Sequence, residues 1–383
     1  MSVNRLGVGL CVLGMLLAGA AGQVAVAQAR HLVDIRNFTG GADGGTPAAG
    51  LIQASNGAFY GTTAHGGIGF GTLFKMDASG RLTTLHVFHG QSDGANPYAG
   101  LIQVGGAFYG TTQGGGAGGS GTIFRIDANG RLTTLHAFRD QPDGADPYAG
   151  LTEARDGTLY GTTVDGGLGF GTVYKMDASG RVTVLHAFKG GADGDQPYAG
   201  LIQARDGLFY GTTAYGGEGY GTFFRIDASG RFTTLHTFSA ADGMQPSSNL
   251  VQAANGLFYG TTVGGGSGFG VVFTIDTSGT LTKLHAFSGA SDGANPFARL
   301  MPGADGAFYG TTNAGGAGGF GTVFRIDGRG TLTTLHAFQG TADGAYPSTS
   351  GLIRASDGSF YGTTLGGGTS WAGVIFRLAG PPA

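Results

Sequence analysis

The chain has 383 residues, of which 81 are glycine, and it carries a formal net charge of −3 with only 12% charged residues. This charge leaves no basic stripe that could bind a nucleic-acid backbone, so we expect no nucleic-acid partner. Such a glycine content is typical of low-complexity chains. However, 11% of the residues are aromatic and they recur at a strict period, which favours a packed fold.

Residues 1–29 have the pattern of a secretory signal peptide. Arg5 precedes an apolar stretch, and Ala27-Gln28-Ala29 offers small residues at a cleavage site. We therefore expect residues 30–383 to be secreted or periplasmic, with no stable insertion into the membrane after cleavage. An uncleaved membrane anchor is the alternative, although Gln23 and several glycines leave the apolar stretch short for a span.

A unit of about fifty residues follows and is repeated seven times. Its most regular part is Phe59-Tyr60-Gly61-Thr62-Thr63 in the first unit. The tyrosine of this motif returns as Tyr109, Tyr160, Tyr210, Tyr259, Tyr309 and Tyr361. A fixed period of this length is typical of solenoids and propellers.

Each unit contains four short runs with strand character, which in the first unit are residues 50–54, 58–63, 71–77 and 82–88. Tight-turn sequences join the first run to the second and the third to the fourth. Phe59 and Tyr60 are neighbours in a strand and point to opposite faces, so both faces must be covered. The pattern therefore predicts an all-β fold, a seven-bladed β-propeller with four antiparallel strands per blade. A β-solenoid is the alternative architecture.

The two ends of the repeat array predict how the ring closes. The seventh unit stops at 373–378 and lacks its fourth strand, whereas residues 31–38 match that strand and precede the first complete unit. We expect the N-terminal strand to complete the last blade, which closes the ring and leaves no open interface. Residues 30–383 would then form a single domain, which we expect to be a monomer.

The chain resembles the GloVer tandem repeat of bacterial choice-of-anchor proteins. The resemblance lies in Asp-Gly-Ala-Asn-Pro-Tyr-Ala-Gly-Leu-Ile-Gln, Tyr-Gly-Thr-Thr, Gly-Thr-Val-Phe-Arg-Ile-Asp and Leu-Thr-Thr-Leu-His-Ala-Phe, and it covers nearly the whole chain after residue 29. It implies an exported bacterial protein, held at the surface in many members by a C-terminal sorting segment. The last residues, 378–383, have no apolar anchor or basic tail, so we expect free secretion or a periplasmic location. The resemblance implies no established reaction and no catalytic residues.

Histidine and aspartate recur in the units, and we favour structural roles for both. The histidines are His86, His136, His186, His236, His285 and His336, with Arg36 at the seventh position, and the aspartates are Asp43, Asp93, Asp143, Asp193, Asp242, Asp292 and Asp343. Sites spread around a ring cannot share one metal, and no second ligand recurs beside each histidine. We therefore expect no metal site and no cofactor, with a hydrogen bond from each histidine and a turn role for each aspartate. A cation site in each blade is the alternative for the aspartates.

The positions at which the seven units differ are the most informative about function. In a propeller, the loops between strands two and three lie on the same face as the loops that lead into strand one. On these loops, the candidate ligand-binding residues that break the repeat are His65, Asp165, Tyr215, Glu218, Arg299 and Trp371. A polar face dotted with aromatic residues suits a sugar or another hydroxylated ligand, and a solvated rim is the alternative.

We therefore expect an exported, non-catalytic propeller that binds a glycan or a cell-surface protein at this face. The alternative is a secreted carbohydrate-active enzyme, of polysaccharide lyase or lactonase type, that uses the same face. His65, Asp165, Glu218 and Arg299 come from four different units, and no local motif links them, which favours binding over catalysis. A purely structural role is the third hypothesis.

Overall fold

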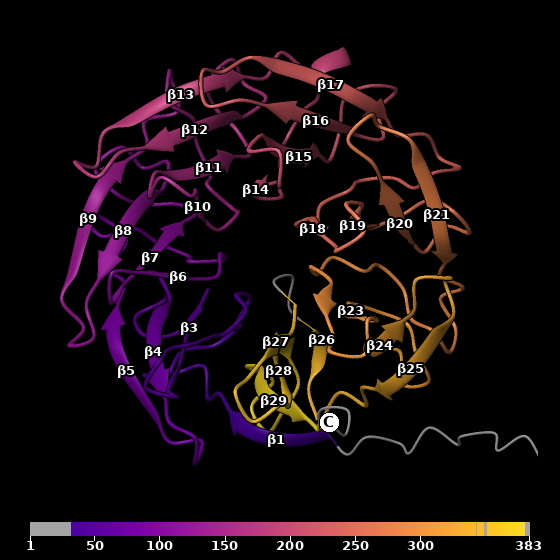
Figure 1. The fold of residues 1–383 in the computed structure, drawn as a ribbon. Helices are drawn as coiled ribbons and strands as arrows, with labels where there is room; N and C mark the ends of the chain where they lie inside the picture. The colour runs from indigo at the N-terminus through magenta and orange to yellow at the C-terminus, as the bar shows by residue number, and fades with distance from the viewer. Residues whose placement is uncertain (1–31, 342, 348–350, 380–383) are drawn as a thin grey trace, which may run out of the picture.

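The computed structural model describes residues 32–341, 343–347 and 351–379. They form a ring of seven blades around a central channel (Figure 1). Each blade is an antiparallel sheet whose four main strands follow one another from the channel to the outer rim. The predicted seven-bladed β-propeller is therefore confirmed. The expected signal peptide, its cleavage site and the C-terminal residues 380–383 lie outside the described residues.

The first six blades each consist of four consecutive strands. Blades one and two are β2 (Ile52–Gln53), β3 (Phe59–Thr63), β4 (Thr72–Met76) and β5 (Leu82–Val87), then β6 (Ile102–Val104), β7 (Ala107–Thr112), β8 (Thr122–Ile126) and β9 (Leu132–Ala137). Blades three and four are β10 (Thr152–Glu153), β11 (Leu159–Thr163), β12 (Thr172–Met176) and β13 (Val182–Ala187), then β14 (Ile202–Gln203), β15 (Phe209–Thr213), β16 (Thr222–Ile226) and β17 (Phe232–Thr237). Blades five and six are β18 (Val251–Gln252), β19 (Phe258–Thr262), β20 (Val271–Ile275) and β21 (Leu281–Ala286), then β22 (Met301–Pro302), β23 (Phe308–Thr312), β24 (Thr322–Ile326) and β25 (Leu332–Ala337).

Blade seven is built from both ends of the described chain. It contains β27 (Ile353–Arg354), β28 (Phe360–Gly366), β29 (Val374–Leu378) and, as its outer strand, β1 (Leu32–Asn37). β1 pairs antiparallel with β29, so that Leu32 lies opposite Leu378. A further strand, β26 (Ala345–Pro347), pairs with the far end of β28. The predicted closure by the N-terminal strand is confirmed.

Helical structure is almost absent from the part of the chain that the structure describes. It consists there of the short 3-10 helix η1 (Gly191–Asp193). Among the same residues, no helix has the length and apolar character needed to cross a bilayer.

Aromatic side chains pack the seams between blades. Tyr60 stacks on Phe108 of the next blade with ring centroids 4.1 Å apart, and the equivalent pair of Tyr361 and Phe59, at 4.5 Å, joins blade seven to blade one. A second contact joins the phenylalanine after each outer strand to an aromatic ring on the third strand of the next blade. At the closing seam this contact is Phe38 with Phe74, at 5.4 Å. These side chains are buried, so the apolar surface of both faces of a blade is removed from water.

The rest of the repeated motif serves the same seams. A Cβ atom on Gly61 would lie 2.7 Å from the ring of Phe74, so only glycine fits beneath that ring. Thr62 donates a hydrogen bond of 3.0 Å to the Pro97 carbonyl of the next blade, and Thr63 shares one of 2.8 Å with Thr72 inside its own blade. Each residue of the motif therefore has a packing or hydrogen-bonding role in the scaffold.

The recurring histidines and aspartates are partners of one another. In blade one, His86 Nε2 lies 2.9 Å from Asp93 Oδ2. The same pair is found in the other units, with the longest separation, 3.5 Å, between His236 and Asp242. Arg36 takes the place of the histidine in blade seven and bonds to Asp43 at 2.9 Å. The predicted hydrogen bond is confirmed for five of the six histidines, with the aspartate of the following loop as partner. His236 is the exception, because its buried Nε2 has no hydrogen-bond partner among the described residues.

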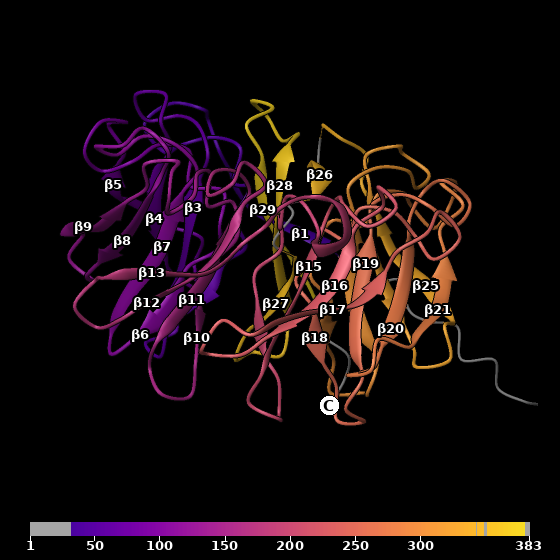
Figure 2. The same ribbon diagram turned by 90° about the horizontal axis from the view of Figure 1, so that it is seen from above.

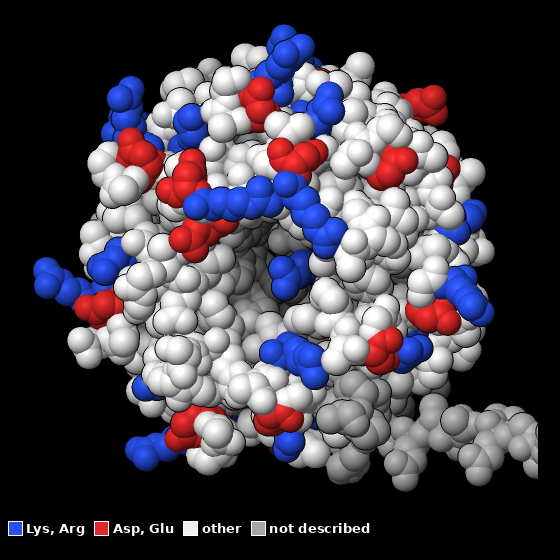
Figure 3. Space-filling view, in the orientation of Figure 1, with Lys and Arg blue, Asp and Glu red and all other residues white. Residues whose placement is uncertain are grey.

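The strand order gives the ring two different faces (Figure 2). We call the face with the longer connections, from strand two to three and from strand four to the next blade, the loop face. The opposite face, with the tight turns, is the turn face. Single β-bridges join the two kinds of loop within a blade, as between Ala145 and Asp165 or between Asp195 and Tyr215. The prediction that these loops share a face is therefore confirmed. Acidic and basic side chains are interspersed around the central opening on the turn face (Figure 3).

Candidate functional site

A cavity of about 180 Å³ lies in the central channel, where the chain enters the inner strands. Its wall includes Tyr98, Tyr148 and Tyr198, from the segments that lead into blades two to four, and Asn249 and Arg299, from blades five and six. Because each inner strand begins at the loop face, these side chains belong to that end of the channel. The cavity is therefore continuous with the loops on which the sequence analysis placed its candidates.

Three tyrosines form a continuous aromatic wall in this cavity. The rings of Tyr98 and Tyr148 are stacked with centroids 5.1 Å apart, and Tyr198 meets Tyr148 edge-on at 5.4 Å. All three side chains are half-buried. Burial raises the pKa of the Tyr98 and Tyr198 phenols above their ordinary value, so both stay neutral in neutral solution. A wall of neutral phenol rings offers flat apolar surface with hydroxyl groups at its edge.

Arg299 brings a positive charge into the same cavity. It stands where most blades have a glycine, and its side chain reaches solvent inside the ring. The partial loss of water there lowers the pKa of the guanidinium, which still carries its charge at neutral pH. The arginine ion pairs among the described residues are made by Arg36, Arg325 and Arg377, and not by Arg299. Its charge is therefore available to a ligand.

Asn249 also replaces a glycine, but its amide is already engaged. Its side-chain oxygen accepts a hydrogen bond of 2.7 Å from the Gly200 backbone N–H of the neighbouring blade. At Gly150 and Gly200 the neighbouring backbones approach closely, whereas a Cβ atom on Gly100 would have its nearest neighbour 3.9 Å away. A Cβ atom on Gly150 or on Gly200 would lie 3.1 Å from the carbonyl oxygen of the preceding blade. The glycines and Asn249 thus shape the narrow part of the channel.

Four aspartates gather on the loop face beside Tyr198. Burial raises the pKa of Asp146, Asp165 and Asp195, and the charges of neighbouring carboxylates raise it further, with Asp140 acting on the first two. The carboxyls of Asp146 and Asp165 also act on each other directly, which raises the pKa of Asp146 and opposes the rise at Asp165. These carboxylates also raise the pKa of Tyr198. The aspartate cluster therefore adjoins the aromatic wall. It contributes acidic groups to this end of the channel, whereas Arg299 contributes a basic group.

The structure brings four of the six candidate residues to this end of the channel. Arg299 lines the cavity, Asp165 belongs to the aspartate cluster, and the His65 ring meets Tyr98 edge-on at 6.3 Å. Tyr215 accepts a hydrogen bond of 2.9 Å from Gln245, and its phenol acts on the pKa of Tyr198.

The other two candidates lie away from the cavity wall. Glu218 is exposed on a loop of blade four, and Trp371 is half-exposed and meets Phe320 edge-on with centroids 6.1 Å apart. Neither side chain lines the cavity.

The sequence analysis missed the three tyrosines of the wall. It names this tyrosine only as part of the repeated motif Asn-Pro-Tyr-Ala-Gly. However, the same position holds Ala48, Ser247 and Phe297 in other units. A residue type confined to neighbouring repeats is the signal that would have identified a one-sided feature of the ring.

The family profile of the Gloeobacter/Verrucomicrobia repeat matches residues 23–220 and again 201–381. The chain belongs to this family. Membership confirms the resemblance to the GloVer repeat and accounts for nearly all of the ring. No curated protein matches the sequence.

Solved structures similar to this ring include three proteins named as lactonases. A protein from Bacteroides uniformis ATCC 8492, provisionally named a 6-phosphogluconolactonase, has a TM-score of 0.52 and 16% identity over 76% of this chain and 84% of its own. A provisionally named gluconolactonase has a TM-score of 0.43 and 12% identity over 73% and 87%. The gluconolactonase XC5397 from Xanthomonas campestris has a TM-score of 0.42 and 12% identity over 69% and 83%. At these identities the likeness concerns the fold.

Proposed function

We propose that the protein is an exported, non-catalytic propeller that binds an acidic glycan at the loop-face end of its channel. The observation that carries the proposal is an arginine without an ion-pair partner among the described residues, in a cavity that also has a wall of three tyrosines. Arg299 supplies a fork of donors that suits a carboxylate. The tyrosine rings supply the flat surface on which a sugar ring packs.

The size of the cavity limits what enters it. Its volume of about 180 Å³ is below the range of roughly 300–1,000 Å³ that is usual for drug-sized ligands. One sugar residue with its acid group would occupy the channel, and the rest of a longer chain would lie across the loop face. There, His65, Asp165 and Tyr215 would bond its hydroxyl groups.

Binding of a uronic-acid oligosaccharide, measured by calorimetry, tests the proposal. The Arg299→Gln variant should lose binding while its melting temperature stays unchanged, because the guanidinium makes no ion pair with the residues that the structure describes. Arg81→Gln is the matched control, since Arg81 is an exposed arginine that follows a tight turn of the turn face. Equal affinity in wild type and Arg299→Gln would contradict the proposal.

A lactonase-type hydrolase is the second candidate, and the paired Asp146 and Asp165 favour it. Burial and neighbouring carboxylates raise the pKa of both groups, and carboxyls with a raised pKa are suited to general acid–base catalysis. Release of acid from a sugar lactone, followed at constant pH, separates the two functions. Turnover that disappears in Asp165→Asn would establish the enzyme and reject the non-catalytic proposal.

Export and a monomeric state are further parts of the proposal, and both rest on the sequence. Protein recovered from the exported fraction should have the intact mass of residues 30–383, since Ala29 ends the expected cleavage site. A closed ring leaves no blade face uncovered against which a second copy would pack, so light scattering should give the mass of one chain.

A further inference from the structure

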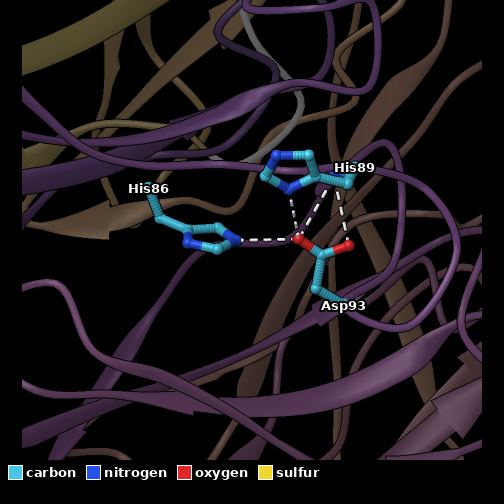
Figure 4. A group of neighbouring side chains, drawn as sticks. All are labelled: His86, His89 and Asp93. Carbon is cyan, nitrogen blue, oxygen red and sulfur yellow. Dashed lines mark hydrogen bonds and ion pairs between the residues drawn. The ribbon is translucent and has the colours of Figure 1, made fainter.

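Three metal-ligating side chains converge at the outer rim of blade one (Figure 4). His86 belongs to β5, His89 follows that strand, and Asp93 lies in the loop that leads to blade two. Their nearest nitrogen and oxygen atoms all lie within 4.8 Å of one another. Among the described residues this is the one group of three histidine, cysteine or acidic side chains so arranged.

We propose that His86, His89 and Asp93 bind a divalent transition-metal ion, with Zn²⁺ as the representative ion. Two imidazoles and a carboxylate are ligands that zinc, copper and nickel accept, whereas calcium and magnesium prefer oxygen alone. A water molecule would complete the coordination. This site is separate from the channel and adds to the proposed glycan-binding function.

The distances are close to those that a tetrahedral ion imposes. Metal–ligand bonds of 2.0–2.2 Å place neighbouring ligand atoms roughly 3.3–3.5 Å apart. Asp93 Oδ2 is 2.9 Å from His86 Nε2 and 3.2 Å from His89 Nδ1. Shifts of about half an ångström would open both distances to that range. Each imidazole would coordinate through the nitrogen that faces the carboxylate and carry its proton on the other ring nitrogen, which leaves a lone pair for the metal.

The surroundings hold the ligands in place. The backbone N–H of His89 lies 3.1 Å from each carboxylate oxygen of Asp93, and the Phe88 ring meets His86 edge-on at 5.0 Å. Thr122 of blade two donates a bond of 3.4 Å to the Asp93 carbonyl. Burial alone would raise the pKa of Asp93, but the hydrogen bonds that it accepts outweigh burial and lower the pKa, so the ligand is ionised at neutral pH. The His89 side chain is 65% exposed, which leaves a path for the ion.

Blade one is the only unit with this set of ligands. The residue at the position of His89 is Thr39, Arg139, Lys189, Ser239, Ser288 or Gln339 in the other units. The sequence analysis predicted no metal site because no second ligand recurs, and His89 is a second ligand that occurs once. Blade five offers a matched comparison, since His285 and Asp292 lie 3.1 Å apart there and the Ser288 backbone N–H bonds to the same carboxylate.

Titration of untagged, chelator-treated protein with Zn²⁺ in a calorimeter tests the site. Wild type should bind one equivalent, and His89→Ser should bind none, because serine is the residue that blade five carries and it preserves the loop. Ser288→His should bind two equivalents, since it completes the same set of ligands in blade five. His136→Gln, which removes a recurring histidine from blade two, should still bind one, and Ca²⁺ should not bind at this site.

Circular dichroism of each variant establishes that the ring is folded before its zinc stoichiometry is compared. An absence of saturable zinc binding by folded wild type would overturn the proposal. So would one equivalent retained by His89→Ser. A folded Ser288→His protein that still binds a single equivalent would show that these three side chains do not suffice, and would overturn it as well.

Discussion

At the scale of single residues, the repeated and the variable positions have different physical origins. Position 61 requires glycine because the Phe74 ring lies against Gly61. Position 62 favours threonine because the Thr62 hydroxyl bonds to a carbonyl of the next blade. Equivalent contacts recur around the ring, so the sequence repeats. Around the channel the constraint is weaker, and Arg299 stands where a glycine is usual.

Substitution of a motif glycine should be costly although its backbone is ordinary. In Gly211→Ala the new Cβ would lie 2.7 Å from the Phe224 ring and 2.9 Å from Leu201, so the core must shift. We expect a loss of roughly 1–3 kcal/mol in the free energy of unfolding, measured by urea denaturation. Gly328→Ala is the control, because its Cβ would meet open space. Equal stability of the two variants would refute the close-packing argument.

The aspartate cluster predicts a gain in stability when one carboxylate is neutralised. The pKa of Asp165 is raised in the folded protein. The stability that this carboxyl contributes is therefore fully present below its pKa in the unfolded chain, and it is lost as the pH rises through its pKa in the folded protein. Asp165→Asn removes this loss and should raise the free energy of unfolding at pH 7 by roughly 0.5–2 kcal/mol.

The gain from Asp165→Asn should shrink towards acid pH, where both carboxyls are protonated. Thermal melts at a series of pH values measure it. The control is Asp156→Asn, at a tight turn where asparagine can accept the same 2.9 Å bond from the Thr158 N–H. A gain that is independent of pH would contradict the assignment to carboxylate repulsion.

At the scale of strands and blades, the sequence predicted the scaffold well because every blade is covered on both faces. The turn pairs, the alternation in residues 58–63 and the incomplete seventh unit each led to a feature that the structure contains. The candidate site was predicted less completely. The pairing of each histidine with an aspartate six or seven residues away, as in His86 and Asp93, depends on the path of a loop, which no local pattern shows.

The loops also contain backbone conformations that local rules disfavour. The residue before each repeated proline has a positive φ, from 53° at Thr46 to 58° at Gln245 and Tyr346. A residue before proline ordinarily prefers an extended conformation, so tertiary contacts must hold this one. The backbone conformation of the loop face therefore could not be predicted from the sequence, although the residues that lie on this face could be.

β1 is the element on which closure depends. Deletion of residues 30–39 would expose the edge of β29 and remove Phe38 from its contact with Phe74. We expect aggregation or loss of cooperative unfolding, because an open sheet edge pairs with other chains. Scanning calorimetry and light scattering measure both effects. A chain that begins at Arg30 is the control. An unchanged melting temperature in the deletion variant would show that β1 is not needed to close the ring.

At the scale of the whole molecule, the seams between blades have matching contacts. The ring should therefore tolerate chain ends that are moved to another blade. The seam between blades seven and one contains the same two aromatic contacts as the seam between blades six and seven, where Tyr309 meets Phe360 at 4.3 Å and Phe338 meets Phe376 at 5.3 Å. The free energy of unfolding of the ring should therefore not depend on which blade contains the chain ends.

A circular permutant tests this equivalence. The paired Leu378 and Leu32 would be joined by Asp-Ala-Ser-Gly-Arg, the five residues that join the equivalent pair Met76 and Leu82 in blade one. New ends would open in the exposed turn between β8 and β9, so that closure moves to blade two. We expect one cooperative transition with a melting temperature close to that of wild type, because every seam and every strand pair is kept. A permutant that unfolds in two steps, or that aggregates as the β1 deletion should, would show that blade seven is specialised for closure and that the seams are not equivalent.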